Sequence, residues 1–171
     1  MSEIKIARFV DIEACKSIFS ENSTFILRSP EYYRKLYGIN RGKHIKGDRN
    51  EGIARTIDGG TAEVRGFLVS CWTILKESEP TTYEWNIFKK YDQNIVAIVS
   101  SPNRVCDFLN KALETKKERP YRRFPFLPVQ HKKVIYDKVH VDKNNIFDVV
   151  PFTKSAQFIG ENEYRFVLLY T

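Results

Sequence analysis

The feature that most constrains the fold is the order in which short apolar runs and helix-like segments follow one another along the 171-residue chain. The two kinds of segment do not alternate regularly, which argues against a doubly wound parallel fold. Strands are expected at residues 4–10, 24–27, 62–73, 95–99, 133–141 and 163–170, and helices at 12–22, 31–37, 84–91, 102–112 and 151–157. The sequence therefore predicts an α+β fold: a single compact domain, residues 1–171, with small mixed or antiparallel sheets and short helices.

Local signals define where two of these helices begin. Asp11 precedes apolar residues at helical spacing and suits an N-cap, because its side chain can accept a hydrogen bond from an amide of the first turn. Pro102 suits the first turn of the fourth helix. The buried stripe of that helix is expected at Val105, Phe108, Leu109 and Ala112. Residues 38–60 are rich in Gly, Lys, Arg, Asp and Asn, so a loop is expected there.

Composition excludes the disordered and fibrous classes of protein. The chain is 42% hydrophobic and 13% aromatic, which is enough for a buried core, whereas disordered chains are poor in such residues. No run approaches the ~18 apolar residues that cross a bilayer. The N-terminus lacks the charged-then-apolar layout of a signal peptide. We therefore expect a cytoplasmic protein without a membrane partner.

The cysteines and histidines are too dispersed to form a recognisable site. Cys15, Cys71 and Cys106 are odd in number and far apart, which suits neither a disulfide framework nor a zinc motif, and we expect them to be reduced and buried. The three histidines show no metal-ligand spacing either. No metal site is predicted.

The net charge of +7 is concentrated in two stretches of the chain. One stretch interleaves cations with aromatic rings, and the other lies within residues 34–49. Cations neutralise phosphates and aromatic rings stack on unpaired bases, so the first stretch suits single-stranded nucleic acid. An ordinary solvated basic loop explains it equally well. The predicted nucleic-acid-binding residues are Lys116, Lys117, Arg119, Tyr121, Arg122 and Arg123.

Polar residues within apolar strands are the candidates for chemistry, because burying them costs free energy unless a partner satisfies them. Arg8 lies in the first strand. Ser70 and Thr73 flank Trp72 near the end of another strand, and the pair Glu161 and Glu163 leads into the last strand. Each has an ordinary structural explanation. Glu163, for example, can pair with Arg165 or with a lysine.

Several short segments, spread over nearly the whole chain, follow one another in a recognisable order. They are Ala7-Arg8-Phe9, residues 23–30, residues 69–73, residues 84–91, residues 95–98, and Lys154 with Glu161-Asn162-Glu163-Tyr164-Arg165. In this order they resemble a family of bacterial and phage proteins catalogued as domain of unknown function 2971. The chain departs from that family where an Asn-Asp-Pro-Phe segment is reduced to residues 47–51, and where the Trp-to-Tyr spacing in a helix is longer. The family's name implies no activity.

The order of the polar groups says more about function. An Arg on the first strand, a Ser or Thr on a middle strand and a Glu-x-Glu before the last strand is similar to the Arg-Ser-Glu arrangement of ADP-ribosyltransferases. The resemblance implies an ADP-ribosyltransferase-like fold with NAD as the substrate. It also implies a catalytic role for Glu163, which would stabilise the oxocarbenium-like state formed when the nicotinamide–ribose bond breaks.

The same resemblance assigns roles to the other polar and aromatic residues. Arg8 would contact a phosphate or ribose of NAD, and Ser70, together with Thr73, would shape the ribose pocket. Phe9 or Trp72 would supply an aromatic face for the nicotinamide. Glu161 would share a face with Glu163 if the strand has already begun, and would lie beside the acceptor nucleophile.

Two functions from different classes remain open. The first is a toxin or phage-defence ADP-ribosyltransferase that modifies a nucleic acid, with RNA favoured, or a target associated with nucleic acid, and that has a neutralising antitoxin-type partner. It requires Arg8, Ser70 and Glu163 to converge on one cleft. The alternative is a non-catalytic nucleic-acid-binding module. A nuclease is disfavoured, because Asp48, Glu51 and Asp58 are interpreted as solvated loop charge.

Overall fold

Strand β4 (Phe67–Ile74) forms the centre of the fold, because it pairs along almost its whole length with the last strand, β8 (Glu163–Leu169). These strands belong to a five-stranded sheet in the order β5-β1-β4-β8-β6, in which every neighbouring pair is antiparallel. The other members are β1 (Ile6–Asp11), β5 (Ile95–Ser100) and β6 (Gln130–Lys133). The computed structural model describes residues 3–20, 25–39, 51–89, 93–117, 127–136, 140–142 and 144–170.

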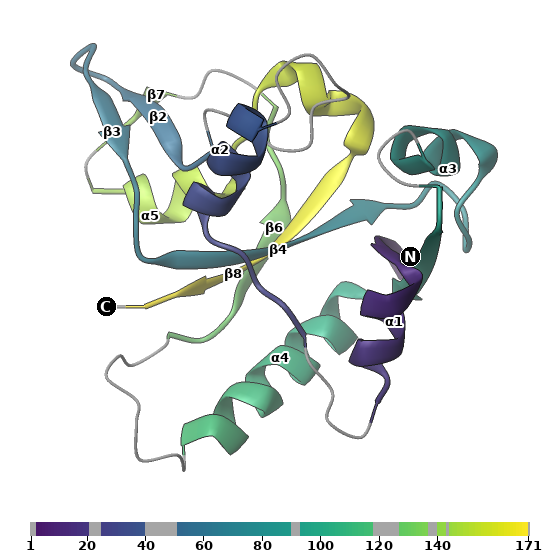
Figure 1. Cartoon of the computed structure of the whole chain (residues 1–171). Coiled ribbons are helices and arrows are strands. Elements are labelled where there is room, and N and C mark those ends of the chain that lie inside the picture. Colours follow the sequence, from purple (N-terminus) through teal and green to yellow (C-terminus); the bar gives the residue numbers. More distant parts are fainter. Residues whose placement is uncertain are drawn as a thin grey trace.

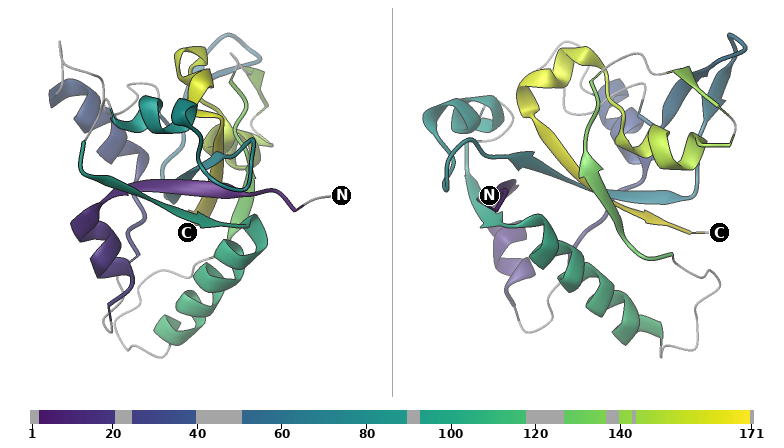
Figure 2. Two further views of the ribbon diagram at one scale, coloured as in Figure 1. Left: turned by 90° about the vertical axis from the view of Figure 1, so that its right-hand side faces the viewer. Right: turned by 180° about the vertical axis from the view of Figure 1, so that it is seen from behind.

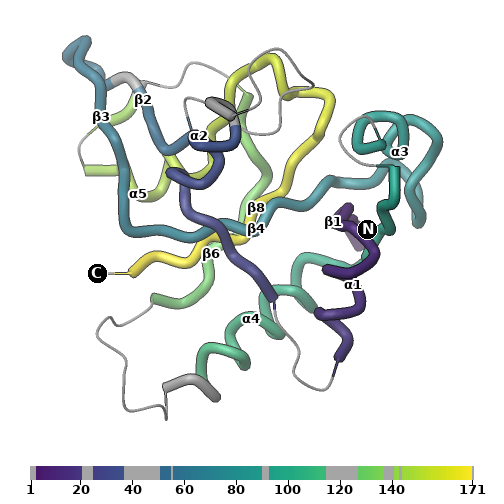
Figure 3. Tube along the Cα trace, in the orientation of Figure 1, coloured from purple at the N-terminus to yellow at the C-terminus, as the bar shows by residue number. Residues whose placement is uncertain are grey.

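A smaller sheet packs beside the first one and has the order β3-β2-β7 (Figure 1). Its β2–β3 pair is antiparallel and its β2–β7 pair is parallel. The strands are β2 (Ile53–Thr56), β3 (Thr61–Glu63) and β7 (His140–Val141). The Cα trace shows β3 continuing through a bend into β4, so that one stretch of chain connects the two sheets (Figure 3).

Helices cover both faces of the larger sheet. They are α1 (Ile12–Ile18), α2 (Pro30–Ile39), α3 (Thr82–Lys89), α4 (Pro102–Lys117) and α5 (Ile146–Val149), with the 3-10 turns η1 (Val150–Phe152) and η2 (Ala156–Glu161). Helix α4 lies on one side of the sheet, and α2, α5 and the smaller sheet lie on the other (Figure 2). No helix among the described residues has both the length and the apolar character that crossing a bilayer requires.

Two hydrophobic clusters form because side chains alternate between the faces of a strand. Val69 and Val167 belong to the cluster beneath α2, α5 and the smaller sheet. Trp72 and Phe166 belong to the cluster beneath α4, where Leu109 also packs. Both faces of β4 and β8 are therefore buried, which explains why these strands are apolar almost throughout the sequence.

The structure confirms the α+β class: the described residues form a single compact domain with an antiparallel sheet and several short helices. Asp11 is the N-cap of α1, and its carboxylate accepts a hydrogen bond of 2.7 Å from the amide of Ala14. In α4, Val105 and Leu109 are buried as expected, whereas Phe108 is 45% exposed.

Several predicted boundaries were wrong. Residues 25–27 form no strand. In this segment Arg28 alone makes an isolated bridge, to Val69, because α2 already begins at Pro30. The strand predicted at 62–73 is two strands, separated by Gly66, whose positive φ of 84° turns the chain. In the predicted loop at 38–60, residues 53–56 form β2, whereas residues 40–50 lie outside the described residues. In the predicted strand at 133–141, Lys133 ends β6 and residues 140–141 form β7, whereas residues 137–139 lie outside the described residues.

Candidate functional site

A pocket of about 220 Å³ opens where β1 separates from β4. The two strands pair only at Ile6 with Ile74 and at Ala7 with Thr73, after which β1 continues alone alongside β5. The pocket is lined by residues of β1 and β4 and by Glu163 at the start of β8. The sequence-predicted residues that line this pocket are Arg8, Phe9, Trp72, Thr73, Glu161 and Glu163.

Arg8 forms the β1 wall of the pocket. Its Nη1 donates to Ser70 Oγ at 3.0 Å and its Nη2 donates to the carbonyl of Ile26 at 3.0 Å. The guanidinium lies 4.4 Å from the centre of the Phe25 ring. Burial lowers the pKa of Arg8, but an arginine remains charged. Within the described part of the chain, no carboxylate pairs with this cation.

Ser70 orients Arg8 without lining the pocket itself. Ser70 is 1% exposed, and its hydroxyl accepts hydrogen bonds from Arg8 and from Trp72 Nε1, the latter at 2.9 Å. The Trp72 ring is also buried, with its centre 6.5 Å from that of Phe25 and 6.1 Å from that of Phe166. Trp72 therefore supports the pocket from the core and does not offer a free ring face.

Phe9 and Phe88 contribute aromatic surface to the pocket. Their rings stack with centres 4.3 Å apart and planes inclined by 11°. Trp85 contacts the edge of the same pair, with its centre 5.2 Å from that of Phe9. Phe88 lies on α3, so this helix positions an aromatic residue that the sequence alone did not identify as part of a site.

Glu163 is a buried, ion-paired carboxylate in the opposite wall, and it is 2% exposed. Its Oε1 accepts from Arg165 Nε at 2.6 Å and its Oε2 accepts from Lys154 Nζ at 2.7 Å. Burial alone raises the pKa of a carboxyl group, but these two cations outweigh it and lower the pKa of Glu163 to about 2. The structural pairing considered from the sequence, with Arg165 or with a lysine, is therefore present with both partners.

Lys154 joins the two acidic residues of the Glu-x-Glu motif. Its Nζ donates to Glu161 Oε2 at 2.7 Å as well as to Glu163. Burial lowers the pKa of a lysine, but the two carboxylates raise that of Lys154 well above its usual value. Glu161 ends η2 and Asn162 has a left-handed backbone, so strand alternation does not align the two carboxylates. Lys154 brings them together instead.

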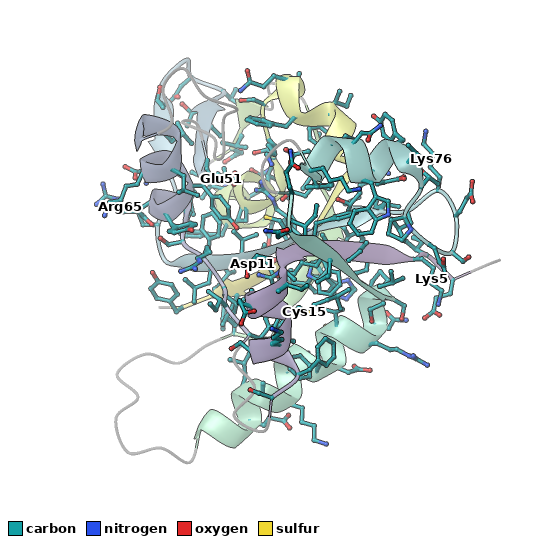
Figure 4. All side chains as sticks on the ribbon, turned by 45° about the vertical axis from the view of Figure 1, so that its right-hand side comes forward. Lys5, Asp11, Cys15, Glu51, Arg65 and Lys76 are labelled. Atoms are coloured by element: carbon teal, nitrogen blue, oxygen red, sulfur yellow. The ribbon has the colours of Figure 1, made fainter. Side chains whose placement is uncertain are left out.

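Arg165 extends this network to Glu51, at the entry to β2. The guanidinium is fully buried, and its Nη1 and Nη2 donate to the two oxygens of Glu51 at 2.5 and 3.0 Å. The interpretation of Glu51 as solvated loop charge was wrong, since it is 3% exposed and lies inside the fold (Figure 4). Burial raises the pKa of Glu51 in spite of its partner, so Glu163 is the more firmly ionised of the two carboxyls.

The remaining acidic and sulfur groups give no support to a metal site or a cysteine nucleophile. No group of three or more potential metal ligands lies among the described residues. Asp58 accepts a hydrogen bond from Thr56 in the turn after β2, and Asp48 lies outside the described residues. Cys71 lines the pocket, but burial and the nearby Glu163 raise the pKa of its thiol. All three cysteines are free and only partly buried, not fully buried as expected.

The predicted nucleic-acid-binding stretch lies largely outside the described residues. Lys116 and Lys117 are the last two residues of α4, so the stretch begins on a helix and not in a loop. The rest of it, namely Arg119, Tyr121, Arg122 and Arg123, is not described.

Sequence reasoning missed Glu51 as the buried partner of Arg165 and Phe88 as a residue that lines the pocket. A usable signal was Arg165 itself, because a charged residue within an apolar strand requires buried partners. No protein-family model, curated protein or solved structure matches the chain. The resemblances described from the sequence therefore stay predictions, and the case for function rests on the pocket.

Proposed function

We propose that this protein is an NAD-dependent ADP-ribosyltransferase whose active site is the pocket between β1, β4 and β8. One observation carries the proposal. Of the seven catalytic and cofactor-binding residues chosen from the sequence, six line this pocket, and the seventh, Ser70, holds Arg8. These residues come from distant parts of the chain, so their convergence on one cleft is the requirement that separates the enzyme from a simple binding module.

The electrostatics of the pocket suit a dinucleotide with a positively charged nicotinamide ring and negatively charged phosphates. Arg8 offers a cation that lacks a carboxylate partner in the described chain, which suits a phosphate. The opposite wall carries Glu161 and Glu163, which share a single lysine. The stacked pair of Phe9 and Phe88 offers the apolar surface that a nicotinamide ring needs.

The proposed chemistry is cleavage of the bond between the nicotinamide nitrogen and the ribose carbon. Nicotinamide leaves with the bonding electron pair, and the acceptor's nucleophile forms the new bond to the ribose carbon. Glu163, held ionised by Arg165 and Lys154, stabilises the positive charge that develops on the ribose. Glu161 lines the same pocket and accepts the proton that the acceptor loses.

RNA is the acceptor that we favour, with a neutralising protein partner of the antitoxin type. The reason is the basic and aromatic stretch that begins at Lys116 and Lys117, the last two residues of α4, and continues beyond the helix in the sequence. If this stretch binds RNA, the affinity falls steeply with rising salt, because each phosphate contact releases a counterion. A set of Lys and Arg to Gln substitutions within residues 116–123 is expected to reduce that dependence.

The decisive experiment incubates the protein with NAD labelled in the adenylate moiety and with separate pools of RNA, DNA and protein. The wild type is expected to transfer label to one pool. Glu163→Gln and Glu161→Gln are expected to abolish the transfer. Glu51→Gln is the matched control, because it also removes a buried carboxylate bound to Arg165 but does not border the pocket. It is expected to retain transfer at temperatures where it is folded.

Two outcomes would overturn the proposal. One is NAD left intact in every pool by a folded wild-type protein, which favours the non-catalytic nucleic-acid-binding module. The other is equal loss of transfer in Glu51→Gln and Glu163→Gln while both are folded. That result would assign Glu163 to the stability of the network and not to chemistry.

A further inference from the structure

A second hollow, of about 250 Å³, adjoins the pocket at the end of β4. Thr73 lines both hollows. The segment that ends η2 also borders both, since Glu161 lines the first hollow while Gly160 and Asn162 line the second. The second hollow was assigned no function above, and it shares the wall formed by Thr73 and the end of η2 with the first.

The volumes favour one ligand that spans both hollows. Small-molecule sites in proteins are usually ~300–1,000 Å³. At about 220 and 250 Å³ each hollow falls below that range, whereas the two together fall within it. A dinucleotide has two halves joined by phosphates, so its shape matches two small hollows with a common wall at Thr73.

The side chains of the second hollow suit a flat base and a phosphate. Tyr83 and Ile159 are 51% and 64% exposed, which places an aromatic ring and an aliphatic side chain in solvent at the same hollow. Lys76 Nζ lies 5.0 Å from the centre of the Tyr83 ring and supplies a cation. Exposed aromatic rings stack on bases at a low cost in conformational entropy.

The acidic residue in this hollow does not oppose an anionic ligand directly. Glu84 is 2% exposed, and its carboxylate accepts hydrogen bonds from the amide and the hydroxyl of Thr81 at the start of α3. These hydrogen bonds hold the carboxylate of Glu84 at the N-terminal end of α3. Lys76 lies at the periphery of the molecule, where it can reach a phosphate (Figure 4).

We infer that the second hollow binds the adenosine monophosphate half of the dinucleotide, with the adenine against Tyr83 and Ile159 and a phosphate near Lys76. The inference rests on the proposed function for its choice of ligand. It adds a specificity site, on α3 and η2, that recognises the half of the substrate that does not react.

The test measures binding without any reaction. Adenosine monophosphate and nicotinamide mononucleotide are titrated separately into the wild type and into Tyr83→Ala, Tyr83→Phe and Ile159→Ser, with affinities taken from calorimetry. Tyr83→Ala is expected to weaken adenosine monophosphate about tenfold, the lower part of the range for loss of a stacked base. Tyr83→Phe keeps the ring and is expected to bind normally. All affinities for nicotinamide mononucleotide are expected to stay within about twofold of the wild type.

Phe147→Ala is the matched control, since Phe147 is 54% exposed on α5 and lines neither hollow. The inference is overturned if adenosine monophosphate does not bind, or binds equally well to the wild type and to Tyr83→Ala. It is also overturned if a short oligoribonucleotide displaces adenosine monophosphate while NAD does not, because the hollow then holds a base of the acceptor. If adenosine monophosphate binds with an affinity that depends on Tyr83 but the protein transfers no label, the second hollow is supported as a binding site and the proposed transferase activity is rejected.

Discussion

The two walls of the pocket use charged residues in opposite ways. On the β8 wall, each of the charged side chains Arg165, Glu163 and Lys154 has an oppositely charged partner within 2.7 Å. On the β1 wall, Arg8 contacts a hydroxyl, a carbonyl and a ring, and no carboxylate of the described chain. The contrast separates charges that are paired within the fold from a cation that is available to a phosphate.

The difference follows from the cost of burying charge. A fully buried ion pair is costly to break, because removal of one partner leaves the other desolvated and unpaired. Arg8 is only partly buried and its hydrogen-bond partners are neutral. Removal of Arg8 therefore leaves no opposite charge buried and unpaired. Stability should therefore depend on the β8 wall and ligand affinity on the β1 wall.

The largest effect is expected for Arg165→Met, which leaves Glu51 and Glu163 without their shared guanidinium. The free energy of unfolding, measured by urea denaturation, is expected to fall by ~3–5 kcal/mol. Arg65→Met is the control, because Arg65 pairs with Glu63 while 75% exposed, and such pairs contribute ~0–1 kcal/mol. Equal effects of the two substitutions would contradict a structural role for the β8 wall.

The next effect is the pH dependence of Glu163→Gln. The pKa of Glu163 is lowered from 4.5 to about 2 in the folded protein, so its carboxylate stabilises the fold above pH ~4.5, and this stabilisation is lost as the pH falls towards 2. One pKa unit corresponds to ~1.4 kcal/mol, which gives roughly 3 kcal/mol at neutral pH. Urea denaturation of both proteins between pH 3 and 7 should show a difference that shrinks on acidification. A constant difference would mean that the ion pairs contribute little.

The smallest effect is expected on the β1 wall. Arg8→Gln and Ser70→Ala each remove the hydrogen bond between these residues, and each is expected to lower the free energy of unfolding by ~1–2 kcal/mol. Because the two share that bond, the double variant should lose less than the sum of the single losses. If Arg8→Gln proves as costly as Arg165→Met, the distinction between the two walls fails.

Elements with a strong local signal could be predicted from the sequence. The N-cap of α1 at Asp11, the start of α4 at Pro102 and the apolar strand β8 all depend on neighbouring residues. The described residues 25–27 of the strand predicted at 24–27 form no strand, because apolar content alone does not show whether a partner strand lies alongside. Strand β2 was missed because its four residues follow a long polar stretch and pair with β3 and β7.

The polar residues of the candidate site could be predicted from the sequence, but their ion-pair partners and the packing of α3 against β1 could not. Arg8, Ser70 and Glu163 were chosen because polar groups within apolar strands need partners. The pairing of Arg165 with Glu51 spans 114 positions in sequence, and nothing local indicates it. Phe88 was missed for a similar reason, since only the folded chain places α3 against β1.

The most direct test of the proposed function is equilibrium binding of NAD, measured by calorimetry at low salt, to the wild type, Arg8→Gln and Arg65→Gln. The wild type and Arg65→Gln are expected to bind with similar affinity. Arg8→Gln should bind about tenfold or more weakly, because it lacks a charge-assisted contact to phosphate. Absence of NAD binding by the folded wild type, or equal binding by Arg8→Gln, would contradict the assignment of this pocket.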